Sequence, residues 1–159
     1  MIRITRITDH GIILLTHFAL IPLGIVFNAR DLAGQEEMSL PMVSKILKML
    51  AAAGLLESHR GVKGGYSLAR EANSITLLEI ITAMEGPVGM TECTAPEVTA
   101  CERASFCRVR PHWEVINTSI RDALKNVTLR DVAVPARAVA TPAVPATNEI
   151  RPTTPSSAR

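Results

Sequence analysis

A chain of 159 residues has room for one domain with its own core and leaves too little for a second full domain. Aromatic residues make up only 3% of it, so the core must be built from aliphatic side chains, which favours packed helices. The net charge is +2, yet residues 1–70 hold eight Lys and Arg against five Asp and Glu, whereas residues 71–134 hold six against nine. The sequence therefore predicts a mainly α protein whose first part faces a polyanion.

The apolar stretch at residues 11–27 follows two arginines, so it has to be weighed as a secretion signal. Polar residues and Pro22 interrupt it, it is short for a membrane span, and the residues before Arg30 make a poor cleavage site. We therefore expect a cytoplasmic protein in which this stretch forms a buried first helix.

Three helices are predicted before residue 55. Thr8 caps the first helix, which ends before Pro22. Asn28 caps a second helix of barely two turns that Gly34 stops, and Ser39 opens a third helix with an apolar face. The opposite, polar face of this third helix carries Ser44, Lys45 and Lys48. Two short helices joined by a tight turn, the second with basic residues outward, are typical of a helix-turn-helix.

A hairpin follows the third helix. Residues 55–59 and 66–69 predict two short strands, and the glycine-rich turn between them carries Arg60 and Lys63. Glycines permit positive φ and leave room for the backbone to approach a phosphate, while the two cations bring charge to the tip. The predicted DNA surface is therefore Ser44, Lys45, Lys48, Arg60 and Lys63. For Lys48, the alternative is an ordinary solvated helix face.

The second half of the chain contains two further helices. Thr76 and Glu79 form a capping box that opens one, and Gly86 closes it. Pro111 starts a long helix with an apolar stripe of Trp113, Ile116, Ile120 and Leu124, extended by Val127. We expect the stripe to be a homodimer seam, because no later helix is predicted to cover it; the alternative is that it packs back on its own domain. From residue 135 onward, Pro, Ala, Thr and Ser predict a disordered tail.

All three cysteines of the chain, Cys93, Cys101 and Cys107, fall in the irregular loop between these helices. An odd number clustered in one loop indicates shared ligands rather than a disulfide framework. Thiolates favour an iron-sulfur cluster, zinc or copper(I), and spacing alone does not choose among them or exclude three bare thiols. No catalytic constellation of side chains is found, so we expect a protein that is not an enzyme.

Four regions are predicted from these features. Residues 1–86 form a winged helix-turn-helix DNA-binding domain with a small β-hairpin wing, and residues 87–110 form a cysteine-rich loop. Residues 111–134 form a dimerisation helix, and residues 135–159 form the disordered tail.

The sequence resembles the Rrf-type regulators, which include the IscR and NsrR regulators, over residues 1 to about 134. The order of helix-turn-helix, Ser-His-Arg-Gly-Val-Lys-Gly-Gly-Tyr wing at 58–66, three cysteines and long helix carries the resemblance. Thr-Asp-His-Gly at 8–11, Val-Ser-Lys at 43–45, Glu-Gly-Pro at 85–87 and Cys-Arg-Val-Arg-Pro-His-Trp at 107–113 are similar to the branch that regulates the SUF iron-sulfur assembly system. The resemblance implies a homodimeric regulator that binds a palindromic operator through the same DNA surface and holds a 2Fe-2S or 4Fe-4S cluster on the three cysteines.

The fourth ligand of such a cluster is where this sequence departs from its relatives. IscR-type members have a histidine three residues after the third cysteine, but here that position is Arg110, whose guanidinium stays protonated. The candidates are His112 and Asp9, the latter corresponding to an aspartate that reaches across the dimer in NsrR-type relatives. We favour Asp9, because a ligand from the other subunit would couple the cluster to dimer geometry. In the alternative reading, Asp9 stabilises a helix N-terminus and His112 merely occupies a first helical turn.

Three functional hypotheses remain open at this point. The first is a repressor or dual regulator that senses its cluster. The second keeps DNA binding but makes the cysteines a zinc site or a thiol switch. The third is an iron-sulfur carrier or assembly partner whose basic face contacts protein.

Overall fold

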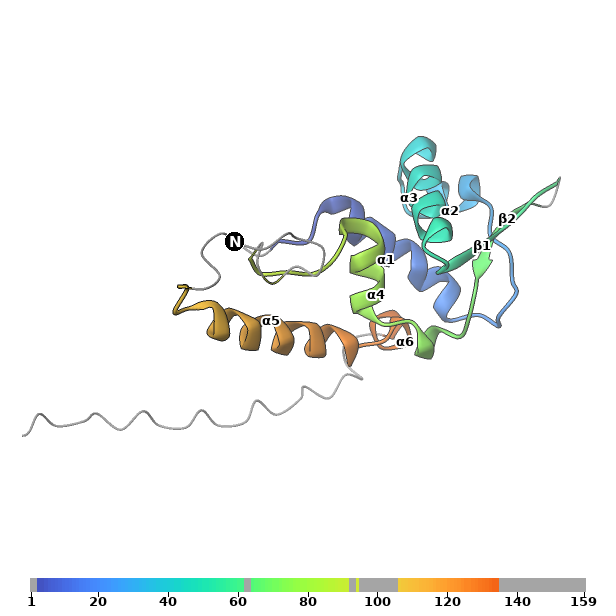
Figure 1. Cartoon of the computed structure of the whole chain (residues 1–159). Coiled ribbons are helices and arrows are strands. Elements are labelled where there is room, and N and C mark those ends of the chain that lie inside the picture. Colours follow the sequence, from blue (N-terminus) through green and yellow to red (C-terminus); the bar gives the residue numbers. More distant parts are fainter. Residues whose placement is uncertain (1–2, 62–63, 92–93, 95–105, 135–159) are drawn as a thin grey trace, which may run out of the picture.

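The computed structural model of the chain describes residues 3–61, 64–91, 94 and 106–134 (Figure 1). The elements run in the order α1 (Arg6–Ala19), α2 (Ala29–Gln35), α3 (Leu40–Ala52), β1 (Leu56–His59), β2 (Gly65–Leu68), η1 (Ala72–Ser74), α4 (Leu77–Glu85), α5 (Arg110–Lys125) and α6 (Leu129–Ala133). The strands β1 and β2 pair antiparallel, with Leu56 opposite Leu68. The predicted mainly α architecture with one small hairpin is thus present, while the predicted tail at 135–159 lies outside the described residues.

Helix α1 forms the centre of the core and packs against α3, α4 and α6 (Figure 1). The buried side chains are almost entirely aliphatic, as the shortage of aromatic residues requires. The largest fully buried hydrophobic side chains are Phe18, Leu14, Leu15, Leu32, Val43, Ile46, Leu47, Leu50, Ile75, Ile80 and Leu129. Among the described residues, no helix is long and apolar enough to cross a membrane.

For α1 and α2, some of the predicted helix boundaries are confirmed and others are wrong. Thr5, not Thr8, caps α1, because the Thr8 backbone N–H donates to Thr5 Oγ1 at 3.3 Å and Thr8 itself is fully buried inside the first turn. Asn28 caps α2 as predicted, accepting from the Asp31 N–H at 2.9 Å. The helix then continues through Gly34 to Gln35, because one glycine in a helix costs only about 1 kcal/mol.

The long helix expected over residues 111–134 is two helices. Helix α5 ends at Lys125, and α6 begins after Thr128 with a second capping box, in which Thr128 and Asp131 bond to each other's backbone N–H. Val127 therefore lies outside α5, and the expectation that no helix follows the stripe was wrong. The short α6 is nevertheless part of the core, because Leu129 is fully buried.

A pair of backbone hydrogen bonds joins the starts of α4 and α6. The Leu77 N–H donates to the Val127 carbonyl and the Leu129 N–H donates to the Ile75 carbonyl, both at 2.8 Å, which forms an isolated bridge between Thr76 and Thr128. The capping box predicted at Thr76 is also present. Two helix N-termini are thus fixed side by side, and α6 is held where it can reach α1.

The beginning of α1 is tied to the end of α4 by Glu85. The Thr5 backbone N–H donates to Glu85 Oε1 at 2.8 Å, and hydrogen bonds from the Thr8 hydroxyl and from Thr5 lower the pKa of this carboxyl from 4.5.

We expect Glu85→Gln to lower the free energy of unfolding at pH 7 and to have less effect as the pH falls. A lowered pKa in the folded state stabilises the fold above the unfolded value of 4.5, and this contribution disappears as the carboxyl becomes protonated below it. Urea unfolding of the wild type and the variant between pH 7 and about pH 3 measures the difference. The control is Glu57→Gln on β1, an exposed carboxylate. A constant difference between wild type and Glu85→Gln over this range would contradict the assignment.

Candidate nucleic-acid interface

The predicted recognition helix has the expected two faces. Helix α3 packs on α2 and on the core through Val43, Ile46, Leu47 and Leu50. Lys45 and Lys48 are exposed, while Ser44 is half-buried. Figure 1 shows α2 and α3 at one side of the molecule, away from α5. Two of the three predicted polar positions on this helix therefore lie open to solvent.

The hairpin projects from the body as a thin arm beyond β1 and β2 (Figure 1). Arg60 is exposed at the start of its turn, and Gly61 follows with φ +107°, a conformation that favours glycine. A Cβ at Gly64 would come within 2.6 Å of the His59 carbonyl oxygen, so the turn is tight enough to require glycine there as well. Lys63 lies outside the described residues.

The wing is held to the body by a contact that the sequence analysis did not find. Phe27, between α1 and α2, forms a bridge with Tyr66 through two backbone hydrogen bonds of 2.9 and 2.8 Å. Gly65 makes this close approach possible, because a Cβ there would lie 2.3 Å from the Phe27 carbonyl oxygen. The side chain of Phe27 also packs edge-on against Phe18, with ring centroids 5.1 Å apart. The apolar run at residues 25–27 was the available signal for this isolated bridge.

Two histidines fix the elements of this interface. His17 of α1 bonds through Nε2 to Glu36 Oε1 at 2.5 Å, which ties α1 to the end of α2. His59 Nε2 lies 2.8 Å from the buried hydroxyl of Ser67, across the hairpin. The first contact holds α2 against α1, and the second joins the two strands of the wing.

Only part of the predicted cluster site falls on described residues. Cys107 is a half-buried free thiol just before α5, whereas Cys93 and Cys101 lie outside the described residues. Asp9 is exposed in the first turn of α1, and His112 is exposed in the first turn of α5. Within the part of the chain that the structure describes, no three His, Cys, Asp or Glu side chains are grouped closely enough to hold a metal ion.

Helix α5 holds the segment that leads into the cysteine loop. Asn117 is only 7% exposed; its Oδ1 accepts from the Met90 N–H at 3.2 Å and its Nδ2 donates to the Thr94 carbonyl at 3.3 Å. Arg121 Nη1 donates to the Val88 carbonyl at 3.3 Å. The sequence analysis did not find Asn117, although a polar residue four positions after Trp113, within an apolar stripe, was a visible signal. Its amide positions the backbone on both sides of Cys93.

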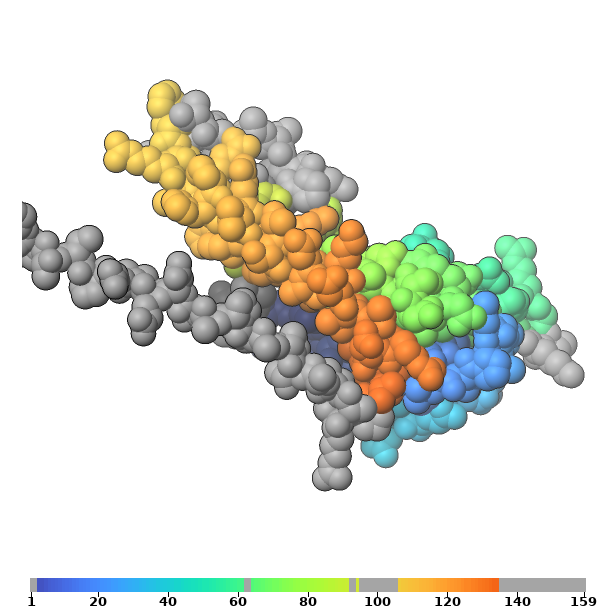
Figure 2. All heavy atoms as spheres, turned by 90° about the horizontal axis from the view of Figure 1, so that it is seen from below, coloured from blue at the N-terminus to red at the C-terminus, as the bar shows by residue number. Residues whose placement is uncertain are grey.

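The predicted dimer seam divides between two environments. Trp113, Ile120 and Leu124 are half-buried. The last two line a pocket of about 500 Å³ together with residues before α1, residues of α4 and the segment 86–90 that follows it. Ile116 is 42% exposed and Val115 is 66% exposed. In the space-filling view α5 forms the outer surface along one side of the molecule (Figure 2). One edge of the stripe thus turns towards its own domain, and an apolar edge remains exposed.

The chain is similar to known transcriptional regulators in sequence and in structure. A family model described as "Rrf2: Iron-dependent Transcriptional regulator" matches residues 4–135. The helix-turn-helix transcriptional regulator IscR of Erwinia tasmaniensis is 30% identical over 102 residues, which are 64% of this chain and 61% of that protein. The chain therefore covers less than two thirds of the length of the relatives that it matches in sequence.

Solved structures show the same architecture. The structure of CymR, the global cysteine regulator of B. subtilis, superposes with a TM-score of 0.65 at 26% identity, covering 84% of this chain and 97% of that one. T. potens IscR superposes with a TM-score of 0.56 at 27% identity, covering 82% and 85% of the two chains. The winged-helix fold predicted from the sequence is confirmed.

Proposed function

Because the chain belongs to the Rrf2 family of transcriptional regulators, we propose that it is a homodimeric DNA-binding regulator whose operator affinity depends on an iron-sulfur cluster held by Cys93, Cys101 and Cys107. The observation that carries the proposal is the position of the exposed Lys45, Lys48 and Arg60 on a helix-turn-helix and a projecting wing. Membership of a family of regulators also confirms the prediction that the protein is not an enzyme. As a regulator of transcription it would act in the cytoplasm.

DNA binding would use α3 and the wing differently. The exposed face of α3, with Lys45 and Lys48, suits the major groove, where polar groups reach base edges. Arg60 at the projecting arm suits a phosphate or a minor groove. In a dimer formed through the exposed apolar edge of α5, two such units would read the two halves of a palindromic operator.

We expect Arg60→Ala to weaken operator binding by about three- to tenfold, and Lys48→Ala to weaken it less. Arg60 lies exposed beside Gly61 at the start of the wing turn, whereas Lys48 is one cation among several on a solvated helix face. The measurement is a fluorescence-anisotropy titration of operator DNA at physiological salt, with Lys125→Ala on α5 as the matched control. If Arg60→Ala and Lys48→Ala both bind like the wild type, the wing does not contact DNA.

The donor set suits an iron-sulfur cluster. Three soft thiolates in one loop are ligands of the kind that such clusters take, and Cys107 is a free thiol that is only half-buried. When bound, a cluster supplies a charged group that responds to oxygen and redox state. Asn117 and Arg121 of α5 hydrogen-bond to Val88, Met90 and Thr94, close to Cys93 in sequence, so a change at the cysteines would act on the proposed dimer helix. Such coupling requires that the cluster interact differently with the two DNA-affinity states.

One set of measurements distinguishes an iron-sulfur cluster from a zinc site and from thiols without metal. An anaerobic ultraviolet-visible spectrum with iron and sulfide assays is expected to show a cluster in the wild type and none in Cys107→Ser. Stoichiometric zinc, or reduced thiols without metal, would turn the proposal into a zinc-site or thiol-switch regulator.

We propose Asp9 as the fourth ligand, ahead of His112. Both are exposed in first helical turns, and an aspartate given by the other subunit would link cluster binding to dimer geometry. Asp9→Ala is expected to change the absorption spectrum and the oxygen lability of the cluster, while His112→Ala changes neither. The reverse pattern would assign the ligand to His112, and two silent variants would exclude both.

The SUF iron-sulfur assembly operon is the proposed target. Binding of its promoter in a gel-shift assay, with no binding of a scrambled duplex of equal length, is the expected result. A protein that carries a cluster and binds neither duplex would instead be an iron-sulfur carrier whose basic face contacts protein.

A further inference from the structure

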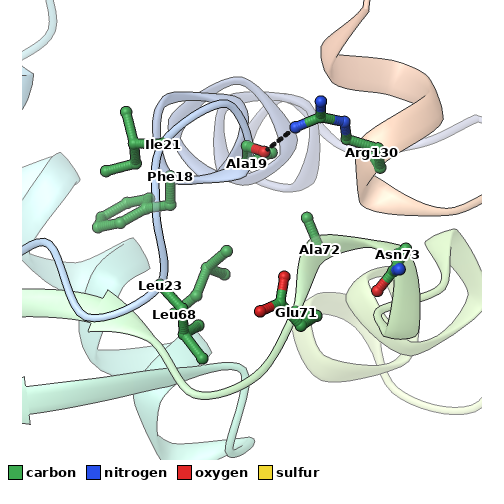
Figure 3. Close-up of a pocket in the computed structure, with 9 residues that line it drawn as sticks. All are labelled: Phe18, Ala19, Ile21, Leu23, Leu68, Glu71, Ala72, Asn73 and Arg130. Carbon is green, nitrogen blue, oxygen red and sulfur yellow. Dashed lines mark hydrogen bonds between the residues drawn. The ribbon is translucent and has the colours of Figure 1, made fainter.

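A cavity of about 300 Å³ lies beside the C-terminal end of α1. It is separate from the proposed DNA surface and from the proposed cluster site. It is partly open to solvent and is lined by the end of α1 and the connection after it, the end of β2, the η1 turn and the residue before it, and α6 (Figure 3). None of the predicted DNA or cluster residues lines it. Its apolar wall consists of Phe18, Ala19, Ile21, Leu23, Leu68 and Ala72.

Two groups of opposite charge face this apolar wall. Figure 3 shows the Glu71 carboxylate turned into the space between Leu68 and Ala72, with Arg130 on the opposite side of the opening. Arg130 Nη1 donates to the Ala19 carbonyl at the end of α1, at 2.9 Å. A guanidinium has five N–H donors, so most of them stay available. Among the described residues, the Glu71 carboxylate forms no ion pair, with Arg130 or with any other cation.

We propose that this cavity binds a small zwitterion, an α-amino acid with an apolar side chain. The ammonium group would pair with Glu71, the carboxylate would pair with the remaining N–H donors of Arg130, and the side chain would lie against Ile21 and Leu23, the accessible apolar residues of the lining. Hydrogen bonds between two charged groups are stronger than hydrogen bonds between neutral groups, and an apolar surface beside them strengthens them further. The volume lies at the lower end of the range for small-molecule sites, which suits a metabolite of this size.

A ligand in this cavity would contact segments that are far apart in the sequence. Arg130 belongs to α6, which follows α5, whereas the connection after α1 leads to α2 of the helix-turn-helix. An amino acid bound there joins the C-terminal helices to the DNA-reading half. This inference does not depend on the cluster, because its residues and its test are separate from the cysteines.

Isothermal titration calorimetry on the full-length protein tests the proposal. The probes are L-leucine, L-methionine and L-valine, each up to about 10 mM, with 3-methylbutylamine and 4-methylpentanoate as analogues that lack one of the two charges. At least one amino acid is expected to bind, and each analogue is expected to bind about tenfold more weakly. Glu71→Gln is expected to weaken amino acid binding about tenfold, while the control Glu57→Gln leaves it unchanged.

Glu71→Gln alters an exposed side chain, so the fold is expected to remain intact, which circular dichroism checks. Arg130→Gln also removes the contact with Ala19, and Arg130→Lys, which keeps the charge, should retain part of the binding. The absence of binding by all three amino acids would overturn the proposal. Equal binding of an amino acid and an analogue, or unchanged binding by Glu71→Gln, would overturn it as well.

Discussion

Replacement of Gly65 by alanine is expected to lower the free energy of unfolding by about 2–3 kcal/mol and to reduce DNA binding strongly. An added Cβ would lie 2.3 Å from the Phe27 carbonyl oxygen, 2.7 Å from the Phe27 carbonyl carbon and 2.8 Å from Val26 Cγ1. Two of these atoms are backbone, so they cannot move aside as the end of a side chain can. The bridge between Phe27 and Tyr66 must open, and the wing then loses its attachment to the body.

Gly34→Ala is the matched control. No atom lies within 4 Å of a Cβ built on Gly34, and the residue is inside α2, so alanine is expected to stabilise the protein by about 0.5–1 kcal/mol. Urea unfolding of the two variants, followed by far-ultraviolet circular dichroism, measures both effects. Similar stability of Gly65→Ala and the wild type would show that the backbone at Phe27 gives way and that the bridge does not hold the wing.

Asn117→Leu is expected to lower the free energy of unfolding by about 1–3 kcal/mol and to loosen the segment that leads to Cys93. Leucine keeps most of the volume but leaves the Met90 N–H and the Thr94 carbonyl without their partner, because both bond to the Asn117 amide. Asn117 is 7% exposed, so water replaces these bonds poorly. The position is therefore sensitive although it is neither a predicted ligand nor a DNA contact.

The control is Asn126→Leu at the exposed C-terminal end of α5. Urea unfolding gives the stability, and limited trypsin digestion between residues 91 and 109 reports on the segment, which should be cut faster in Asn117→Leu alone. If the proposed cluster is present, its absorbance should also bleach faster in air. Equal behaviour of the two leucine variants would mean that α5 does not hold the cysteine segment through this amide.

Local patterns predicted those parts of the fold that local interactions determine. The caps at Asn28 and Thr76 and the two faces of α3 depend on residues a few positions apart, and the structure has them as predicted. The prediction that Thr8 caps α1 was wrong, because Thr5, three residues earlier, is an equally suitable capping residue. Burial decided between the two, since Thr8 is fully buried, and burial depends on the packing of α1 against the rest of the chain.

The residues of the candidate site also differ in whether local sequence patterns could predict them. Lys45, Lys48 and Arg60 were found because helical periodicity and turn chemistry place them on the surface. Asn117 and Phe27 gain their roles from partners far along the chain, which leave no periodic signal. The short α6 was missed because five residues with one capping box give little signal against the longer stripe before them.

The bridge between Thr76 and Thr128 joins two segments that the ribosome synthesises at different times. Leu129 completes the core around α1, yet the ribosome adds it only after the whole cysteine segment has been synthesised. Until then the nascent helix-turn-helix has an open gap where this side chain belongs, and a core that lacks a leucine is less stable by about 2–5 kcal/mol. A chain interrupted before residue 128 is therefore expected to fold less stably than one that has passed all three cysteines and reached Leu129.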